Sequence, residues 1–247
     1  MVLGADMAFG EQTLVGASVS ASRLQFDLDR PNAWATGDEF GLNLYGLHRV
    51  GNAYASAMLF AATNRLTYHS SLRGFGYDLA GETTFDNRTL GGRLETGYAF
   101  ASSSRRVTLT PFVAVQPTQV YQDDAREVYN AELGIGVNFR AAVIESLPAD
   151  LGVQIGSHWT LASGARLTSF ARLAWRHDFE PDRSVQRDFH GIRLRDSSLP
   201  EAEDTGIARL GMQYSLGRAL SVTGEVEGQW SSPYDTVGGS IGLQYRW

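Results

Sequence analysis

The sequence predicts an all-β fold, an antiparallel β-barrel that spans a membrane. Three observations carry this prediction. Stretches in which every second residue is apolar recur along the whole chain, and a period of two is the period of a β-strand. One face of these stretches is almost free of charge, whereas the other face is polar. The links between them alternate between short and long, as the two rims of a membrane barrel require.

The N-terminal half supplies five predicted strands. Residues 2–9 and 13–21 alternate aliphatic side chains with glycine, serine and aspartate. Residues 40–46 set phenylalanine and leucine against glycine, asparagine and tyrosine. Residues 53–62 are apolar on both faces, so the sequence does not show which of their faces is the outer one. Residues 90–100 set leucine and aromatic side chains against arginine, glutamate and glycine.

The C-terminal half supplies six more strands by the same test. In the tenth strand of the chain, Val222 and Val226 lie on one face and Glu225 lies on the other. The last strand carries Tyr245 and Trp247 on its apolar face. The six stretches are 107–115, 149–158, 167–176, 207–216, 220–230 and 237–247.

The links predict two different rims. Tight turns are expected at 10–13, 49–52, 102–106, 161–166 and 217–219. Long links alternate with them, and loops of this length are uncommon in compact soluble domains. We therefore expect outer loops at residues 23–39, 63–88, 116–146 and 178–204, with a brief last link at 231–235.

The polar faces carry the candidate functional residues. We predict that these residues line the lumen of the barrel, where their charges pair across strands, line a conduit, or do both. An apolar face on every strand exceeds what a soluble monomer exposes, so lipid is the expected solvent and the sheet must close. The predicted lumen residues are Asp6, Asn43, Arg93, Glu95, Asp150, Gln154, Arg172, Arg209, Glu225, Glu227 and Arg246.

Aromatic residues support the same orientation. They lie near strand ends on the apolar face, where membrane proteins place interfacial girdles. They are Phe9, Phe40, Tyr98, Phe100, Trp175, Trp230, Tyr245 and Trp247.

Composition excludes several classes of function. Charged residues make up only 19% of the chain and the net charge is −6, so a nucleic-acid partner is not expected. The absence of cysteine excludes disulfides and thiolate metal sites. No helical membrane span and no signal peptide are visible, so we expect an export signal upstream of Met1.

Catalytic and metal sites are weakly supported. His177 beside Asp178 could be half of a hydrolase dyad, but adjacent strand residues point to opposite faces. His69 and His190 fall in predicted outer loops, without a G-x-S-x-G turn. Asp123 and Asp124 lack a calcium-loop pattern. We therefore predict no catalytic residues, no metal and no cofactor.

Whether the number of strands is odd or even determines how the barrel can close. Eleven strands are visible, whereas bacterial single-chain barrels have an even number. We therefore expect one strand to be missing at the front. Without it, Val2–Phe9 would meet Val237–Trp247 in a strained parallel pairing, or the edges would recruit another strand.

An ordered set of motifs resembles one known family. "TLVGASVSAS", "LETGYAF", "TLTPF", "LAWRHDF", "ARLGMQYSL" and "GLQYRW" follow one another along the chain. In this order they resemble the C-terminal translocator barrel of autotransporters (type Va secretion). The resemblance implies a twelve-stranded barrel in the bacterial outer membrane, with a lumen helix that leads to an exported passenger.

The resemblance also implies partners and a function. Residues 1–247 would be one N-terminally truncated translocator domain, not an enzyme, in contact with outer-membrane lipid and with its own passenger, which this chain lacks. The outer-membrane assembly machinery would read the last strand, with Tyr245 and Trp247 as its signal. The alternatives are a free-standing porin, adhesin or receptor barrel and, third, an outer-membrane hydrolase.

Overall fold

A computed structural model of the chain consists of strands joined by turns and irregular links. It describes residues 1–28, 33–74, 77–104, 106–130, 135–181, 184–189, 192–197, 202–217, 219–232 and 235–246. No helix long and apolar enough to cross a bilayer occurs among these residues.

Eighteen strands are present within the described ranges. They are β1 (Val2–Phe9), β2 (Thr13–Leu28), β3 (Ala33–Val50), β4 (Ala53–Gly74), β5 (Tyr77–Tyr98), β6 (Phe100–Ala101), β7 (Val107–Val115), β8 (Thr118–Gln122), β9 (Ala125–Asn130), β10 (Ile135–Phe139), β11 (Ala142–Ser146), β12 (Pro148–Thr160), β13 (Arg166–Asp178), β14 (Ser184–Phe189), β15 (Ile192–Ser197), β16 (Asp204–Leu216), β17 (Leu220–Ser231) and β18 (Asp235–Tyr245).

Several of these strands are segments of one longer wall strand. β6 continues β5 beyond Ala99. β7, β8 and β9 follow one another along the edge of β5, and they pair in turn with β12, β11 and β10. Within the described residues the wall therefore consists of eleven strands, as the sequence predicts. β14 and β15 form a hairpin, and β14 pairs with β10.

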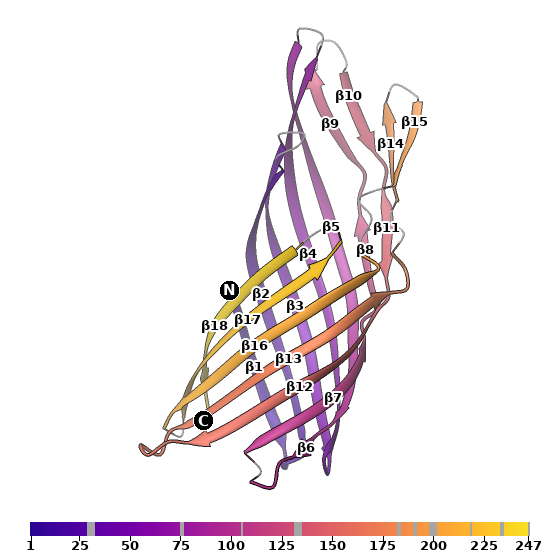
Figure 1. The fold of residues 1–247 in the computed structure, drawn as a ribbon. Coiled ribbons are helices and arrows are strands. Elements are labelled where there is room, and N and C mark those ends of the chain that lie inside the picture. Colours follow the sequence, from indigo (N-terminus) through magenta and orange to yellow (C-terminus); the bar gives the residue numbers. More distant parts are fainter. Residues whose placement is uncertain are drawn as a thin grey trace.

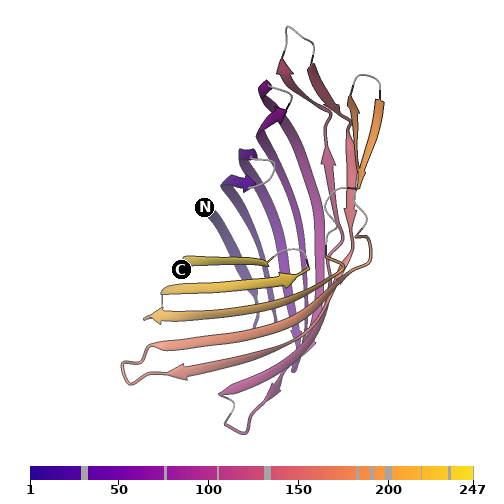
Figure 2. The ribbon, with the colours of Figure 1, turned by 45° about the horizontal axis from the view of Figure 1, so that its top comes forward.

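Neighbouring wall strands are antiparallel throughout, and the sheet curls without closing. Figures 1 and 2 show a trough rather than a ring. β1 pairs with β2, and β18 pairs with β17. No pairing joins β1 to β18 in the described part of the chain, so the expected parallel contact does not form. The first and last of eleven antiparallel strands run in the same direction, so an antiparallel pairing of β1 with β18 is not available either.

The face of the sheet that points outward is apolar along its middle, as predicted. Leu173 is 60% exposed, Leu210 is 62% exposed and Ile241 is 88% exposed. We call this region the apolar band. The described members of the predicted aromatic girdle are all exposed, between 45% for Tyr98 and 63% for Tyr245.

The short turns lie where they are expected, and glycine explains four of them. Gly10, Gly51, Gly164 and Gly217 have φ values of 66°, 60°, 79° and 79°. Positive φ is accessible to glycine without a steric cost, so each of these residues lets the chain reverse within a few positions.

The long links are a correction to the sequence prediction. Residues 23–28 and 33–39 extend β2 and β3, and residues 63–74 and 77–88 extend β4 and β5. Within 116–146, β8 to β11 are also paired strands. These hairpins rise beyond the apolar band, and their outer faces carry polar side chains such as Arg65, Thr67 and His69 in place of apolar ones.

Ion pairs mark the upper limit of the apolar band on the outer face. Arg23, Asp38, Arg65 and Asp86 are direct cross-strand partners on β2 to β5. Close contacts join Arg23 to Asp38 at 3.3 Å, Arg65 to Asp86 at 2.7 Å and Arg88 to Asp123 at 2.8 Å. We call these six residues the outer collar.

Candidate functional site

Five charged side chains form a cluster on the inner, concave face of the sheet. We call Arg93, Glu95, Asp150, Arg172 and Arg176 the inner cluster. The register brings them together, because Glu95, Ala114, Asp150 and Arg176 are successive partners on β5, β7, β12 and β13. Ala114 is small and 94% buried, so side chains from β5 and β12 meet over it.

Each carboxylate of the inner cluster binds two arginines. Arg93 lies 2.8 Å from Glu95 and 2.8 Å from Asp150. Arg172 reaches Glu95 at 2.6 Å, across two intervening strands, and donates to both of its oxygens. Arg176 lies 2.7 Å from Asp150. Bidentate geometry of this kind gives the strong form of an arginine–carboxylate pair.

Neutral side chains hold the inner cluster in place. Tyr54 on β4 donates a hydrogen bond of 2.8 Å to Glu95. The guanidinium of Arg172 lies 3.5 Å from the centre of the Phe112 ring, a cation–π contact. Phe112 in turn lies over Gly152, where a Cβ would come within 2.4 Å of the ring and 2.5 Å of the Leu173 carbonyl oxygen. Glycine at this position is therefore what admits the ring that supports Arg172.

A second inner group follows on β16 and β17. Arg209 is the direct partner of Glu227 in the register and makes an Nε hydrogen bond of 2.5 Å to it. It also lies 3.3 Å from Glu225. Arg172 and Arg209 are themselves direct partners across β13 and β16. Their like charges are tolerated because each has its own carboxylates on the far side.

The two inner groups have one chemical property in common. Each cation lies against an anion, and the side chains of Glu95 and Asp150 are only 10% and 5% exposed. Ion pairs join seven of the predicted lumen residues, which are Arg93, Glu95, Asp150, Arg172, Arg209, Glu225 and Glu227.

Other predicted residues lie apart from these groups. Asn43 donates a hydrogen bond of 3.2 Å to Ser18. Asp6 is exposed, in the row of Gly16 and Tyr45. Gln154 is the partner of Arg172 in the register.

The C-terminal candidates are also separate. Arg246 is exposed, and its backbone N–H bonds to Ala219. Tyr245 lies on the outer face, and Trp247 lies outside the described residues.

Two residues that support the inner cluster were not predicted from the sequence. Tyr54 gave no signal because its strand is apolar on both faces. Phe112 did give a signal, because it is an aromatic residue at a polar-face position of its strand.

The hydrolase candidates do not assemble. The His177 ring lies 3.1 Å from Asp204, whereas Asp178 accepts bonds from Ser146 and from the Leu147 backbone. Ser70 bonds to Glu127 at 2.5 Å, away from His69, which stacks on Trp34. His190 lies outside the described residues. In the part of the chain that the structure describes, no cluster of three or more histidine, aspartate or glutamate side chains is arranged to hold a metal ion.

A sequence profile of the autotransporter beta-domain matches residues 1–227. The chain belongs to the autotransporter beta-domain family. As an autotransporter beta-domain, it is an outer-membrane β-barrel domain that exports a passenger domain. No curated protein matches the chain. Nothing favours a free-standing porin or adhesin over the family assignment.

Solved structures agree with this autotransporter fold. The translocator domain of the autotransporter NalP from Neisseria meningitidis has a TM-score of 0.77 at 17% identity, over 100% of this chain and 79% of its own. The beta domain of the Bordetella autotransporter BrkA has a TM-score of 0.65 at 16% identity, over 100% and 89%. The CymD monoaromatic hydrocarbon channel has a TM-score of 0.59 at 16% identity, over 99% and 73%. Because a channel shares the fold, the family profile is what separates export from diffusion.

Proposed function

We propose that residues 1–247 form a single translocator domain whose inner wall presents compensated charge to the chain that it exports. The observation that carries this proposal is the mutual pairing of arginines and carboxylates on the concave face. A wall with an excess of positive or of negative charge would bind oppositely charged segments of a passing chain. Charges that already have partners keep the wall hydrated and give a moving segment no strong site at which to stop.

Removing the acidic partners of Arg209 tests this role. In the full-length gene product, Glu225→Gln with Glu227→Gln leaves Arg209 without the two carboxylates that lie against it. We expect passenger display to slow severalfold, measured as the protease-accessible passenger on intact cells per folded barrel. Adding Arg209→Gln removes the excess charge and should restore the rate. The proposal would be contradicted if the double variant exported the passenger at the normal rate. It would also be contradicted if adding Arg209→Gln did not restore the rate.

The same proposal assigns the remaining partners. Outer-membrane lipid covers the apolar band, and one further strand, antiparallel to both β1 and β18, completes an even-numbered barrel. The support is the pair of edges that have no partner in the described pairings. The domain acts in transport rather than catalysis, which fits the separate hydrogen bonds of His177 and Asp178.

The last strand is assigned to recognition by the assembly machinery. An unpaired edge such as β18 can be captured by strand addition, and a terminal aromatic adds an apolar anchor beside it. Tyr245 is 63% exposed on the outer face of β18, so an aromatic side chain lies beside this edge.

Deletion of Trp247 from the full-length protein tests this assignment. We expect a severalfold loss of heat-modifiable barrel in the outer membrane. The matched control is Trp230→Ala, which removes another aromatic side chain, 50% exposed, from the outer face of the neighbouring strand. If the two variants lose the same amount, Trp247 is an interfacial anchor and not a signal.

A further inference from the structure

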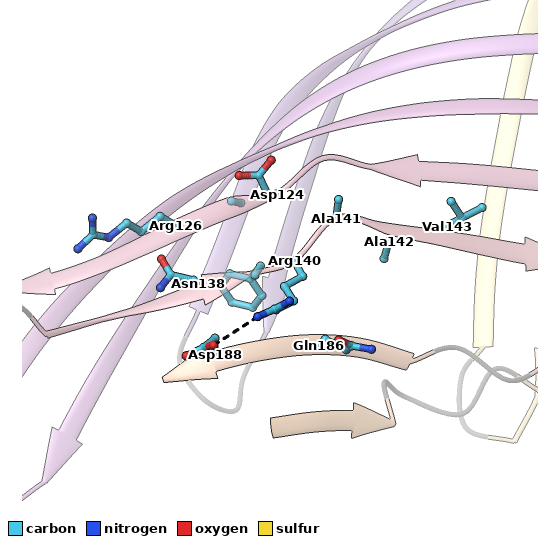
Figure 3. Close-up of a pocket in the computed structure, with 11 residues that line it drawn as sticks. Asp124, Arg126, Asn138, Arg140, Ala141, Ala142, Val143, Gln186 and Asp188 are labelled. Atoms are coloured by element: carbon cyan, nitrogen blue, oxygen red, sulfur yellow. Dashed lines mark ion pairs between the residues drawn. The ribbon is translucent and has the colours of Figure 1, made fainter. Parts of the chain in front are cut away.

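A polar cavity opens outside the inner wall and the proposed conduit. Its volume is ≈ 1010 Å³, and it lies where β9, β10, β11 and β14 meet (Figure 3). Arg126, Asn138, Arg140, Gln186 and Asp188 supply much of its polar lining. Asp124 and Val143 complete the part of the lining on which the argument rests.

The register shows that the cavity lies on the outer face. Glu127 is buried on the inner side, where it accepts a hydrogen bond from Ser70, so the adjacent Arg126 points outward. Arg126 pairs in register with Asn138, and Asn138 pairs with Asp188. All three therefore belong to the face that carries the apolar band.

The strand register also gives the level of the cavity along the wall, relative to the apolar band. Val143, which lines it, is 56% exposed and is the register partner of Tyr121. Tyr121 is in turn the partner of Arg88 in the outer collar. The cavity therefore begins at the level where the apolar band ends, which is the level of the lipid headgroups.

Arg126 differs from the arginines of the outer collar. Each arginine of the outer collar lies within 3.3 Å of a carboxylate. Among the described residues, Arg126 has no carboxylate within 4.0 Å, and the side chain of Asn138 makes no hydrogen bond. Arg140 is 3.6 Å from Asp188, longer than a hydrogen bond, so its donors are only loosely engaged.

We propose that this cavity binds a phosphorylated sugar, the headgroup of a glycolipid in the outer leaflet. Arg126 and Arg140 supply guanidinium groups, which match a phosphate in geometry and charge. Asn138, Gln186 and the two carboxylates, Asp124 and Asp188, supply partners for sugar hydroxyls. The acyl chains of the same lipid run down the apolar band past Val143.

Binding of diphosphoryl lipid A to the full-length protein in detergent tests the proposal. Native mass spectrometry or a fluorescence titration gives the Kd. We expect Arg126→Gln combined with Arg140→Gln to raise it at least tenfold. The matched control is Arg23→Gln, which removes an outer-wall arginine from β2, far along the sheet from the cavity, and should bind as the unchanged protein does. Heat-modifiable mobility shows that each variant is folded.

The remaining outcomes are decisive in the same experiment. Equal affinity in the double variant, or an equal loss in Arg23→Gln, overturns the proposed site. If the double variant does not fold, Arg126→Gln alone gives the same comparison, because that side chain has no carboxylate partner to lose. Glucose 1-phosphate separates the sources of the ligand. If it displaces the lipid at similar concentration, the ligand is a soluble sugar phosphate and the lipid assignment is wrong; if it does not, the lipid assignment is supported.

Discussion

Arginine in place of Leu173 or Leu210 lowers the free energy of unfolding of the full-length protein in lipid vesicles by about 2–4 kcal/mol. The two leucines lie on neighbouring strands in the middle of the apolar band, and both are about three-fifths exposed to what surrounds the barrel. A guanidinium there must either lose its hydration or draw water and headgroups into the bilayer. Denaturant titration in vesicles, followed by heat-modifiable mobility, measures the loss.

A matched control separates lipid from water at the same face. Thr84→Arg puts the same side chain on an exposed outer position of β5 above the outer collar, and it should change the unfolding free energy by less than about 0.5 kcal/mol. Equal losses at Leu173 and at Thr84 would show that the apolar band is not the lipid-facing surface. A variant chain that is monodisperse and folded in water without detergent would show the same.

Loss of Glu95 should be among the most costly changes on the inner wall. Glu95→Gln leaves Arg172 without its carboxylate and Arg93 with only one, and removing one partner of a buried pair costs about 3–5 kcal/mol. Arg172→Gln should cost less, because Glu95 keeps Arg93 and Tyr54. The double variant should lose less than the sum of the two, with a coupling energy of about 1–3 kcal/mol in denaturant titration.

The second inner group provides the comparison for this cycle. Arg209 and Glu225 lie 3.3 Å apart and their side chains are 40% and 37% exposed, so solvent screens their attraction. Their coupling should be measurable but below about 1 kcal/mol. A coupling for Glu95 and Arg172 no larger than this would mean that the inner cluster is hydrated and contributes little to stability.

The sequence was sufficient to predict the apolar outer face of the sheet. Alternation placed Leu173, Leu210 and Ile241 on one face, because a membrane-facing strand must be apolar at every second position whatever its neighbours are. The short turns followed from glycine and from chain reversal. The pairing of Arg209 with Glu225 and Glu227 was also predictable, because consecutive strands of a barrel are neighbours.

The reach of the inner cluster was not predictable in the same way. Arg172 and Glu95 are 77 residues apart and meet over two intervening strands, so their contact depends on the register of four strands and on the small Ala114 and Gly152 between them. The paired extensions of β4 and β5 were also missed. Beyond the apolar band the outer positions become polar, so the apolar face that marks a strand in this sequence is lost although the backbone pairing continues.

The edges of β1 and β18, which have no second partner in the described pairings, constrain the order in which the domain is assembled and inserted. Roughly every second residue of an edge strand directs its N–H and C=O groups away from the sheet, and in hydrocarbon each unmatched group costs several kcal/mol. Two such edges exceed the roughly 5–15 kcal/mol by which folded proteins are stable. Release into the bilayer therefore has to follow the capture of both edges. A sheet that entered hydrocarbon with either edge still open would lose much of its stability, so edge pairing controls when the domain can leave water.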